Sequence, residues 1–265
     1  MNAERGPERI RVEERDDRLV VTLDHAPTRN AIDLRMVEEL HEVCGRLERE
    51  PRILILTGAN GIFASGADIA QLRERRRDDA LAGINSGIFI RIAQLPMPVV
   101  AAVAGYALGG GAELAFAADF RVAAEDARIG NPEAGLGILA AAGASWRLKE
   151  LVGEPLAKEI LLAGRILDAR EALACGLVTE VHPAAELLPA AHALADRIAR
   201  QDPLAVRITK TAFHAPREAH PTVDMLAQGI LFESQAKFDR MQAFLDRRAA
   251  KAAERRDTED KEQES

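Results

Sequence analysis

The sequence predicts an α/β fold that continues into a helical C-terminal part. In the first half, short apolar segments that suit buried strands, such as residues 53–57 and 99–103, alternate with segments of helical periodicity. From residue 140 onward the apolar residues recur mostly at helical spacing, with a single strand expected at residues 177–181. This order indicates stacked ββα or βαβ units around one core, followed by helices.

The N-terminal elements begin with a hairpin. Residues 10–14 and 19–24 flank a turn at Asp16-Asp17, which predicts two paired strands. An amphipathic helix is expected next, because apolar residues recur at helical spacing at Ile32, Met36, Leu40, Val43 and Leu47. A short, fully apolar strand then follows at residues 53–57.

The middle of the chain continues the alternation of helices and strands. Residues 71–95 are expected to be helical in two pieces that end at Pro96, since proline cannot continue a helix. The elements expected after them are a strand at 99–103, a helix at 113–118, and short strands at 120–122 and 127–130.

The C-terminal part is expected to be helical. Apolar periodicity indicates helices at 187–198, 203–213, 226–232 and 238–245. Beyond Lys251 nearly all residues are charged or polar, and we expect this tail to be disordered. The expected division is therefore a core that carries the site at 1–195, a helical region at 196–250 and the charged tail at 251–265.

The composition disfavours several classes of function. The chain has 265 residues, of which 48% are hydrophobic, enough for a sizeable core. Its net charge of −7 argues against nucleic-acid binding driven by bulk charge, since phosphate contacts need a basic face. The two cysteines form no CxxC pair and the six histidines show no ligand spacing, so neither a metal site nor a disulfide framework is expected. Because no apolar secretion signal and no membrane-spanning stretch is apparent, we expect a cytoplasmic protein without a membrane partner.

Three consecutive glycines, Gly109, Gly110 and Gly111, are the most informative feature of the chain. They lie between an apolar strand and a helix that carries Glu113. Without Cβ atoms a ligand can approach this backbone closely, and N–H groups at a helix start have no intrahelical acceptor. Such N–H groups stabilise negative charge. Residues 63–68 have the same character after a strand of their own, so two turns can aim two donors at one developing oxyanion.

Two glutamates lie beside unusual backbone. Glu113 begins the helix next to the glycines, and Glu133 follows Pro132, which makes a rigid turn. Two acids at one site suit general acid–base catalysis, because burial and mutual repulsion separate their pKa values. The alternative for Glu113 is that the helix dipole alone favours it, and the alternative for Glu133 is a solvated loop. The presence of the two glycine turns in the same chain favours the catalytic interpretation of both glutamates.

Two further patterns have weaker functional interpretations. Residues 135–140 match the GxGxxA pattern of dinucleotide sites, but Asn131-Pro132-Glu133 precedes them instead of a strand, which disfavours such a site. The basic run at residues 73–77 is typical of a solvated helical face, and its functional alternative is a clamp for the phosphates of an anionic cofactor.

Taken together, these segments resemble the crotonase (enoyl-CoA hydratase/isomerase) family, from about residue 11 to residue 248. Residues 105–115, around the three glycines, and residues 55–68 are similar to the two oxyanion segments of the family. Asn131-Pro132-Glu133 is similar to the loop that bears the second acid of hydratases. Residues 27–31 are similar to the first loop that contacts coenzyme A, and Arg247-Arg248 to the usual C-terminal ending.

The resemblance implies a fold and a reaction. The fold is a crotonase-like spiral of ββα units with a helical C-terminal trimerisation region, assembled as a homotrimer or as a hexamer of two trimers. The substrate is an acyl-CoA thioester, so coenzyme A arrives as part of the substrate and no cofactor is permanently bound. With both acids retained, the chain is most similar to enoyl-CoA hydratases, which add water across the double bond of a trans-2-enoyl-CoA.

The resemblance also implies roles for individual residues. The N–H groups of Ala67 and Gly110 form an oxyanion hole for the thioester enolate. Glu113 deprotonates the water that attacks C3, and Glu133 delivers a proton to C2. The positions implied to contact the substrate or its coenzyme A are Arg29, Ala31, Ala64, Ser65, Gly66, Asp68, Ile69 and Gly109. The candidates for the acyl pocket are Leu136, Ala141 and Trp146.

One stretch departs from the family pattern. Residues 140–148 lack a proline and one of two paired glycines that hydratases usually carry, and Trp146 replaces a polar residue. The alternatives are another acyl-CoA enzyme on this scaffold (an isomerase, a decarboxylase or a thioester hydrolase) or a non-catalytic or RNA-binding relative. Retention of both acids disfavours a loss of catalysis, and the acidic balance disfavours RNA. The sequence leaves open the acyl group, the pathway, and the choice between trimer and hexamer.

Overall fold

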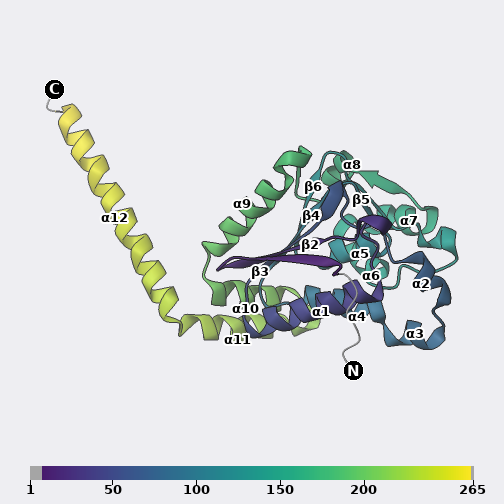
Figure 1. Cartoon of the computed structure of the whole chain (residues 1–265). Helices are drawn as coiled ribbons and strands as arrows, with labels where there is room; N and C mark the ends of the chain where they lie inside the picture. The colour runs from purple at the N-terminus through teal and green to yellow at the C-terminus, as the bar shows by residue number, and fades with distance from the viewer. Residues whose placement is uncertain (1–7, 264–265) are drawn as a thin grey trace. The chain divides into compact units, whose positions relative to one another are not determined.

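The structure is a computed structural model that describes residues 8–263, with side chains for residues 8–251 (Figure 1). The chain divides into two compact units, the first ending at Gln201 and the second beginning at Asp202. The boundary expected from the sequence, at residue 195, lies inside helix α9 (Leu187–Ala199). The buried face of α9 continues to Ile198, so the boundary follows the end of the helix.

A six-stranded sheet forms the centre of the first unit. Its strands stand in the order β1 (Ile10–Glu14), β2 (Arg18–Leu23), β3 (Ile53–Gly58), β4 (Val99–Val103), β6 (Phe120–Ala124) and β9 (Glu180–His182). β1 and β2 pair antiparallel, as the predicted hairpin requires, and all other neighbours are parallel. All residues of β4 are buried, which explains why its sequence is apolar without alternation.

A second, three-stranded sheet pairs β5 (Tyr106–Leu108), β7 (Arg128–Gly130) and β8 (Ile166–Asp168). β5 and β7 are parallel, whereas β7 and β8 are antiparallel. The sequence pattern predicted β7 but neither β5 nor β8, although each of the three strands has only three residues. β5 leads directly into the three glycines, so this sheet fixes where the glycine turn begins.

Helices connect and cover the strands of the first unit. They are α1 (Leu34–Arg49), α2 (Ile69–Glu74), α3 (Arg77–Ala82), α4 (Ile84–Ala93), α5 (Gly110–Ala117), α6 (Ala144–Val152), α7 (Glu154–Ala163), α8 (Ala169–Ala174) and α9. Short 3-10 helices lie at η1 (Ala26–Thr28), η2 (Ala59–Gly61), η3 (Pro132–Leu136) and η4 (Ala184–Glu186). Figure 1 shows α9 running along the large sheet, where it contacts β3, β4 and β6.

The region predicted as two helical pieces contains three helices, α2, α3 and α4. Arg75 has an extended backbone conformation, with φ −64° and ψ 144°, and this ends α2. Gly83 has a φ of 64°, a left-handed value that favours glycine, and it separates α3 from α4. The segment therefore bends twice, which helical periodicity alone does not reveal.

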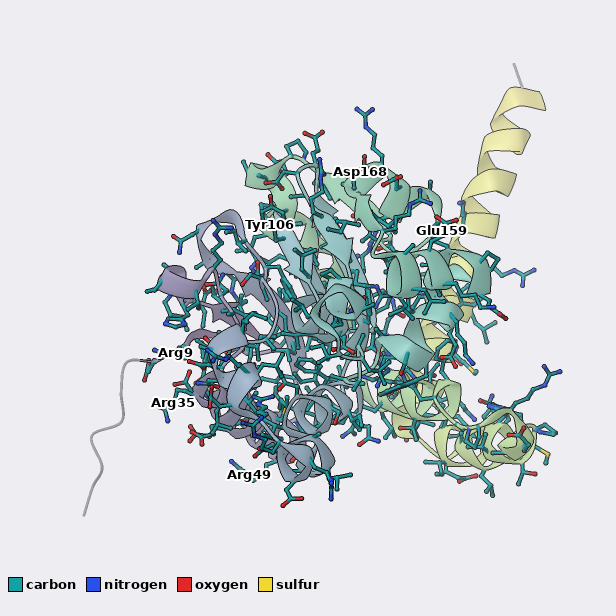
Figure 2. The ribbon with its side chains drawn as sticks, turned by 90° about the vertical axis from the view of Figure 1, so that its right-hand side faces the viewer. Arg9, Arg35, Arg49, Tyr106, Glu159 and Asp168 are labelled. Atoms are coloured by element: carbon teal, nitrogen blue, oxygen red, sulfur yellow. The ribbon has the colours of Figure 1, made fainter. Side chains whose placement is uncertain are left out.

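Charged side chains tie the start of α1 to the chain before β1. Asp33 caps α1 by accepting a hydrogen bond from the N–H of Met36 at 2.8 Å, and it accepts another from Nε of Arg9 at 2.7 Å. The buried Glu39 accepts a hydrogen bond from the backbone N–H of Arg9 at 2.8 Å and forms an ion pair with Arg35. Figure 2 shows Arg9 and Arg35 near one another at the edge of the molecule. The cap explains why α1 begins after Asp33.

A buried arginine holds the C-terminal end of α5. Arg121 donates hydrogen bonds to the carbonyl oxygens of Ala118 and Leu177, each at 2.7 Å. Burial lowers the pKa of Arg121 to about 10, so the side chain remains charged at neutral pH. Because α5 carries Glu113 near its other end, these bonds help to position the candidate site.

The second unit consists of helices α10 (Pro203–Phe213), α11 (Thr222–Phe232) and α12 (Gln235–Gln263), with the 3-10 turn η5 (Arg217–Ala219). Neither α10 nor α11 contains a buried residue. Large apolar side chains are exposed along the unit at Phe213, Met225, Leu226, Ile230, Phe232, Phe238, Met241, Phe244 and Leu245.

The charged tail differs from the sequence expectation of disorder. Residues 251–263 are helical as the end of α12, and residues 264–265 lie outside the described residues. Alanine, glutamate, lysine and arginine are strong helix formers, so a polar composition does not by itself end a helix that has already begun.

Candidate active site

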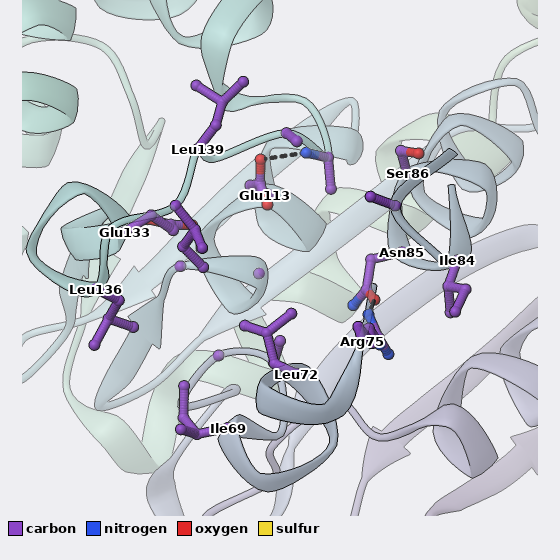
Figure 3. Close-up of a pocket in the computed structure, with 18 of the residues that line it drawn as sticks. Ile69, Leu72, Arg75, Ile84, Asn85, Ser86, Glu113, Glu133, Leu136 and Leu139 are labelled. Atoms are coloured by element: carbon purple, nitrogen blue, oxygen red, sulfur yellow. Dashed lines mark hydrogen bonds between the residues drawn. The ribbon is translucent and has the colours of Figure 1, made fainter. Parts of the chain in front are cut away.

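The two glycine turns and both candidate acids line one cavity of about 490 Å³ in the first unit (Figure 3). Its walls are formed by the turn before α2, the start of α5, the segment from α2 to α4, and the loop that follows Pro132. The predicted site residues that line it are Ser65, Gly66, Ala67, Ile69, Gly109, Gly110, Glu113, Glu133, Leu136 and Ala141. Ten of the 24 residues that line the cavity could therefore be located from the sequence.

The first turn is held by backbone hydrogen bonds on both sides of Ala67. The N–H of Ile32 donates to the carbonyl of Gly66 at 2.8 Å, and the N–H of Asp68 donates to the carbonyl of Ile32 at 3.2 Å. In extended backbone, successive N–H groups point to opposite sides, so the N–H of Ala67 faces away from this pairing.

The second turn brings the start of α5 against the first. Gly109 has a φ of 51°, which favours glycine, and its N–H donates to the carbonyl of Gly130 at 2.8 Å. At Gly111 an added Cβ would lie only 2.3 Å from the carbonyl oxygen of Ala64, so no other residue fits without a shift of the backbone. The absence of a side chain at Gly111 thus allows the two turns to pack directly together.

The two turns meet at a pair of free N–H groups. A Cβ added at Gly110 would lie 3.4 Å from the nitrogen of Ala67, which places these two residues side by side. Within residues 8–263 the N–H groups of Ala67 and Gly110 have no hydrogen-bond acceptor. Both residues line the cavity. Two adjacent donors of this kind can bind one oxygen and stabilise negative charge that develops on it.

Glu113 is held in one orientation by the loop before α6. Its Oε1 accepts hydrogen bonds from the N–H of Ala142 at 2.7 Å and of Ala144 at 3.1 Å, and the first of these is visible in Figure 3. The residue is buried. Burial, reinforced by the charge of Glu133, raises the pKa of Glu113 to about 7, against the opposing effect of the backbone N–H groups. This carboxyl therefore changes charge near neutral pH.

Glu133 approaches from the other side of the glycine turn. An added Cβ at Gly109 would lie 3.2 Å from its Oε1, so the carboxylate packs directly against the Gly109 backbone. Asn131 donates a hydrogen bond to Oε1 at 3.3 Å, whereas Oε2 is buried without a hydrogen-bond partner among the described residues. Burial raises the pKa of Glu133. A buried oxygen without a donor is suited to carry a proton.

The raised pKa of Glu113 predicts a pH-dependent stability difference. A carboxyl with a pKa of 4.5 when unfolded and about 7 when folded lowers the free energy of unfolding as pH rises through this range, because its ionised form is buried at a cost. The neutral substitution Glu113→Gln removes this cost. We expect the free energy of unfolding of the variant, relative to that of the parent, to increase by roughly 2–3 kcal/mol as the pH rises from 5 to 8. Urea unfolding of both proteins at the two pH values checks this, and a difference independent of pH would contradict it.

Four residues implied to contact coenzyme A do not line this cavity: Arg29, Ala31, Ala64 and Asp68. Asp68 caps α2 by accepting a hydrogen bond from the N–H of Gln71 at 2.8 Å. The carbonyl of Arg29 accepts a hydrogen bond from the N–H of Ser65 at 3.1 Å. Ala31 and Ala64 are buried in the core. These contacts shape the first turn, and a role in binding coenzyme A stays a prediction.

Trp146 also lies apart from the cavity, unlike the other two candidates for the acyl pocket. Its side chain is 38% exposed, and the guanidinium of Arg147 lies 5.8 Å from the centre of its ring. The stretch that departs from the family pattern reaches the site through the backbone N–H groups of Ala142 and Ala144, not through the Trp146 ring. Because those bonds come from the backbone, the sequence did not reveal them.

A wall formed by α2, α3 and α4 went unpredicted. The cavity residues that it contributes and that the sequence did not suggest are Leu72, Asp79, Ala80, Gly83, Ile84, Asn85 and Ser86. From the basic run, Arg75 and Arg76 also line the cavity. Arg73 does not, and its side chain is 85% exposed, as a solvated face requires. The phosphate-clamp interpretation of Arg75 and Arg76 stays a prediction.

Two further observations concern metals and membranes. Within residues 8–263 no group of three His, Cys, Asp or Glu side chains is placed to hold a metal ion. Over the same part of the chain, no helix has both the length and the apolar character of a membrane span.

Comparison with known proteins identifies relatives of the whole chain. The family model described as enoyl-CoA hydratase/isomerase matches residues 14–257. A probable enoyl-CoA hydratase of Mycobacterium bovis is 36% identical over 89% of this chain and 95% of its own. The short-chain-enoyl-CoA hydratase of Clostridium acetobutylicum is 35% identical over 86% and 91%. Among solved structures, an enoyl-CoA hydratase of Bacillus anthracis superposes with a TM-score of 0.85 at 32% identity, covering 91% of this chain and 97% of that one.

Proposed function

Because the chain belongs to the enoyl-CoA hydratase/isomerase family and has its fold, we propose that it is an enoyl-CoA hydratase, which adds water across the double bond of a trans-2-enoyl-CoA. One observation carries the proposal: two free N–H groups from separate turns and two buried carboxyls line the same cavity. Addition of water to an enoyl thioester needs these groups, because negative charge develops on the thioester oxygen while protons move at C2 and C3.

The thioester oxygen binds between the N–H groups of Ala67 and Gly110. As water adds to C3, electrons move toward this oxygen and the thioester becomes an enolate. The two donors stabilise the enolate more than the ground-state carbonyl, and each contributes roughly 3–4 kcal/mol to lowering the barrier. The small residues of both turns support this role, since a bulky side chain would cover the donors.

Glu113 takes a proton from the attacking water, and Glu133 gives its proton to C2. The two N–H groups on Oε1 of Glu113 favour its ionised form, which is the form that accepts a proton. The raised pKa of Glu113, about 7, matches the value that general base catalysis needs near neutral pH. The buried Oε2 of Glu133 lacks a donor, so the protonated form of this residue suits the general acid. The two carboxyl groups together carry one proton before and after the reaction. This proton is on Glu133 at the start and on Glu113 at the end.

Coenzyme A enters as part of the substrate, and no permanently bound cofactor takes part in this reaction. The first turn, at Ser65, Gly66 and Ile69, lines the cavity beside the oxyanion donors. It is therefore the part of the chain that we expect next to the thioester and the pantetheine arm.

We further propose that the chain forms a homotrimer or a hexamer. The second unit supports this, because its helices leave many large apolar side chains exposed, an arrangement that association with further copies would cover. Light scattering coupled to size-exclusion chromatography should give a mass about three or six times 28.7 kDa. A particle of one chain mass at micromolar concentration would contradict the proposal.

The hydratase activity is tested by mixing the purified chain with crotonyl-CoA. We expect loss of the absorbance of the conjugated enoyl thioester, with formation of 3-hydroxybutyryl-CoA that incorporates oxygen from labelled water. A shifted double bond, free coenzyme A or released carbon dioxide in place of the hydroxyacyl product would identify an isomerase, hydrolase or decarboxylase instead.

A further inference from the structure

The wall formed by α2, α3 and α4 carries a charged group that hydration itself does not need. Arg75 and Asn85 both line the cavity, and Nη1 of Arg75 donates a hydrogen bond to Oδ1 of Asn85 at 2.8 Å. Figure 3 shows the two side chains meeting on the side of the cavity opposite Glu133 and Leu136. The bond joins the end of α2 to the start of α4 and so holds the guanidinium at the wall.

The guanidinium of Arg75 lacks a carboxylate partner. Among the side chains of residues 8–251 no acid forms an ion pair with Arg75, although Asp79 lines the same wall. Asp79 is engaged elsewhere, because its carboxylate accepts a hydrogen bond from the N–H of Arg76 at the start of α3. Arg75 is half-buried, and Asn85 neutralises none of its charge. A partly desolvated guanidinium without a counter-ion favours an anion in the cavity.

The geometry of the proposed reaction decides which part of the substrate reaches this wall. Glu133 serves C2 and Glu113 serves C3, so the acyl chain beyond C3 continues in the direction from Glu133 past Glu113. In Figure 3 that direction leads from the left of the view toward Ser86, Asn85 and Arg75. Coenzyme A extends from the thioester in the opposite sense, away from Arg75 and Asn85.

The wall that carries Arg75 also offers contacts to an aliphatic chain. Leu72, Ala80 and Ile84 line the cavity on this wall with apolar side chains. The hydroxyl of Ser86 donates to the carbonyl of Gly83 at 3.2 Å, so it is not a free donor for a neutral polar group. A cavity wall with apolar side chains beside a charged donor fits methylene groups followed by an anion.

We propose that the preferred substrate is an enoyl-CoA whose acyl chain ends in a carboxylate, and that Arg75 binds this carboxylate. This inference rests on the proposed hydratase activity and names the substrate class of the same site. Arg75 is then a specificity-determining residue. It acts on the end of the acyl chain, remote from the bonds that change, and the side chain of Asn85 positions it.

The test compares substrates that differ only at the end of the chain. The carboxylate-terminated thioesters trans-2-hexenedioyl-CoA and trans-2-octenedioyl-CoA are each paired with the methyl-terminated thioester of the same length. We expect kcat/KM to favour one or both carboxylate-terminated substrates by about 10- to 100-fold, the effect of one charge-assisted contact. The variant Arg75→Met should remove this preference by lowering only the carboxylate values, and Arg75→Lys should restore part of it.

The matched control is Arg73→Met, which changes an exposed arginine of α2, two residues before Arg75, that does not line the cavity. It should leave both substrate classes unaffected. If Arg75→Met lowers kcat/KM equally for all thioesters, Arg75 contacts the shared coenzyme A portion and the inference is overturned. It is also overturned if the parent hydrates methyl-terminated substrates equally well or better. Both results leave the hydratase proposal standing, whereas hydration of no enoyl-CoA at all would overturn the hydratase proposal itself.

Discussion

Replacing Glu133 by glutamine is expected to lower kcat for hydration of crotonyl-CoA by about 10²- to 10⁴-fold, with little change in KM. Glutamine keeps the shape of the side chain and can still accept the hydrogen bond from Asn131 at Oε1. Its amide nitrogen occupies the position of Oε2, which has no partner among the described residues. The variant therefore retains the cavity but has no proton to give to C2. Steady-state kinetics measure the effect.

A surface glutamate provides the control for this substitution. Glu125 is exposed in the turn between β6 and β7, and Glu125→Gln makes the same chemical change outside the cavity. It should retain the parent rate, with circular dichroism and unfolding curves unchanged for both variants. Hydration by Glu133→Gln at the parent rate would show that Glu133 is not the acid.

Replacing Gly110 by alanine is expected to lower kcat by about 10²- to 10³-fold or more while the protein stays folded. The new Cβ would lie 3.4 Å from the nitrogen of Ala67, a tolerable contact, and the backbone at Gly110 is helical. Alanine is also a better helix former than glycine, so stability should not fall. The methyl group would cover the Ala67 N–H and exclude the thioester oxygen from the two donors.

Two other glycines give matched controls for this variant. Gly87 lies on α4, and an added Cβ there meets nothing within 4 Å, so Gly87→Ala should keep both activity and stability. Gly111→Ala would place a Cβ 2.3 Å from the carbonyl of Ala64 and should destabilise the fold by about 1–3 kcal/mol. Activity retained in a folded Gly110→Ala protein would contradict the proposed role of the two N–H groups.

The sequence reveals the backbone of this site better than its side-chain walls. β3 and β4 are confirmed as buried strands, because a short, fully apolar run that leads into a glycine turn favours a strand covered on both faces. The three glycines could be located for a similar reason. Gly110 and Gly111 serve the close approach of two backbone segments, most clearly at Gly111, whereas Gly109 has a left-handed φ and packs against the Glu133 carboxylate. Such requirements are local, so they can be recognised from the types of residue at these positions.

Other features depend on contacts that residue types do not encode. Arg75 meets Asn85 only because the chain bends at Arg75 and again at Gly83, so no helical period joins the two residues. The bonds that hold Glu113 come from backbone N–H groups, which every residue except proline carries. Trp146 is an unusual residue for its position, yet its ring lies outside the cavity. Helix α6, which carries Trp146, contributes the N–H of Ala144 to the site, whereas the side chain of Trp146 contributes no contact to the cavity.

The central claim is that one thioester oxygen accepts hydrogen bonds from two turns at once. A crystal structure of the protein with a non-hydratable acyl-CoA, such as acetoacetyl-CoA, tests it most directly. The thioester oxygen should lie about 2.7–3.1 Å from both the nitrogen of Ala67 and the nitrogen of Gly110. A thioester oxygen bound to other groups, or within reach of neither nitrogen, would contradict the claim.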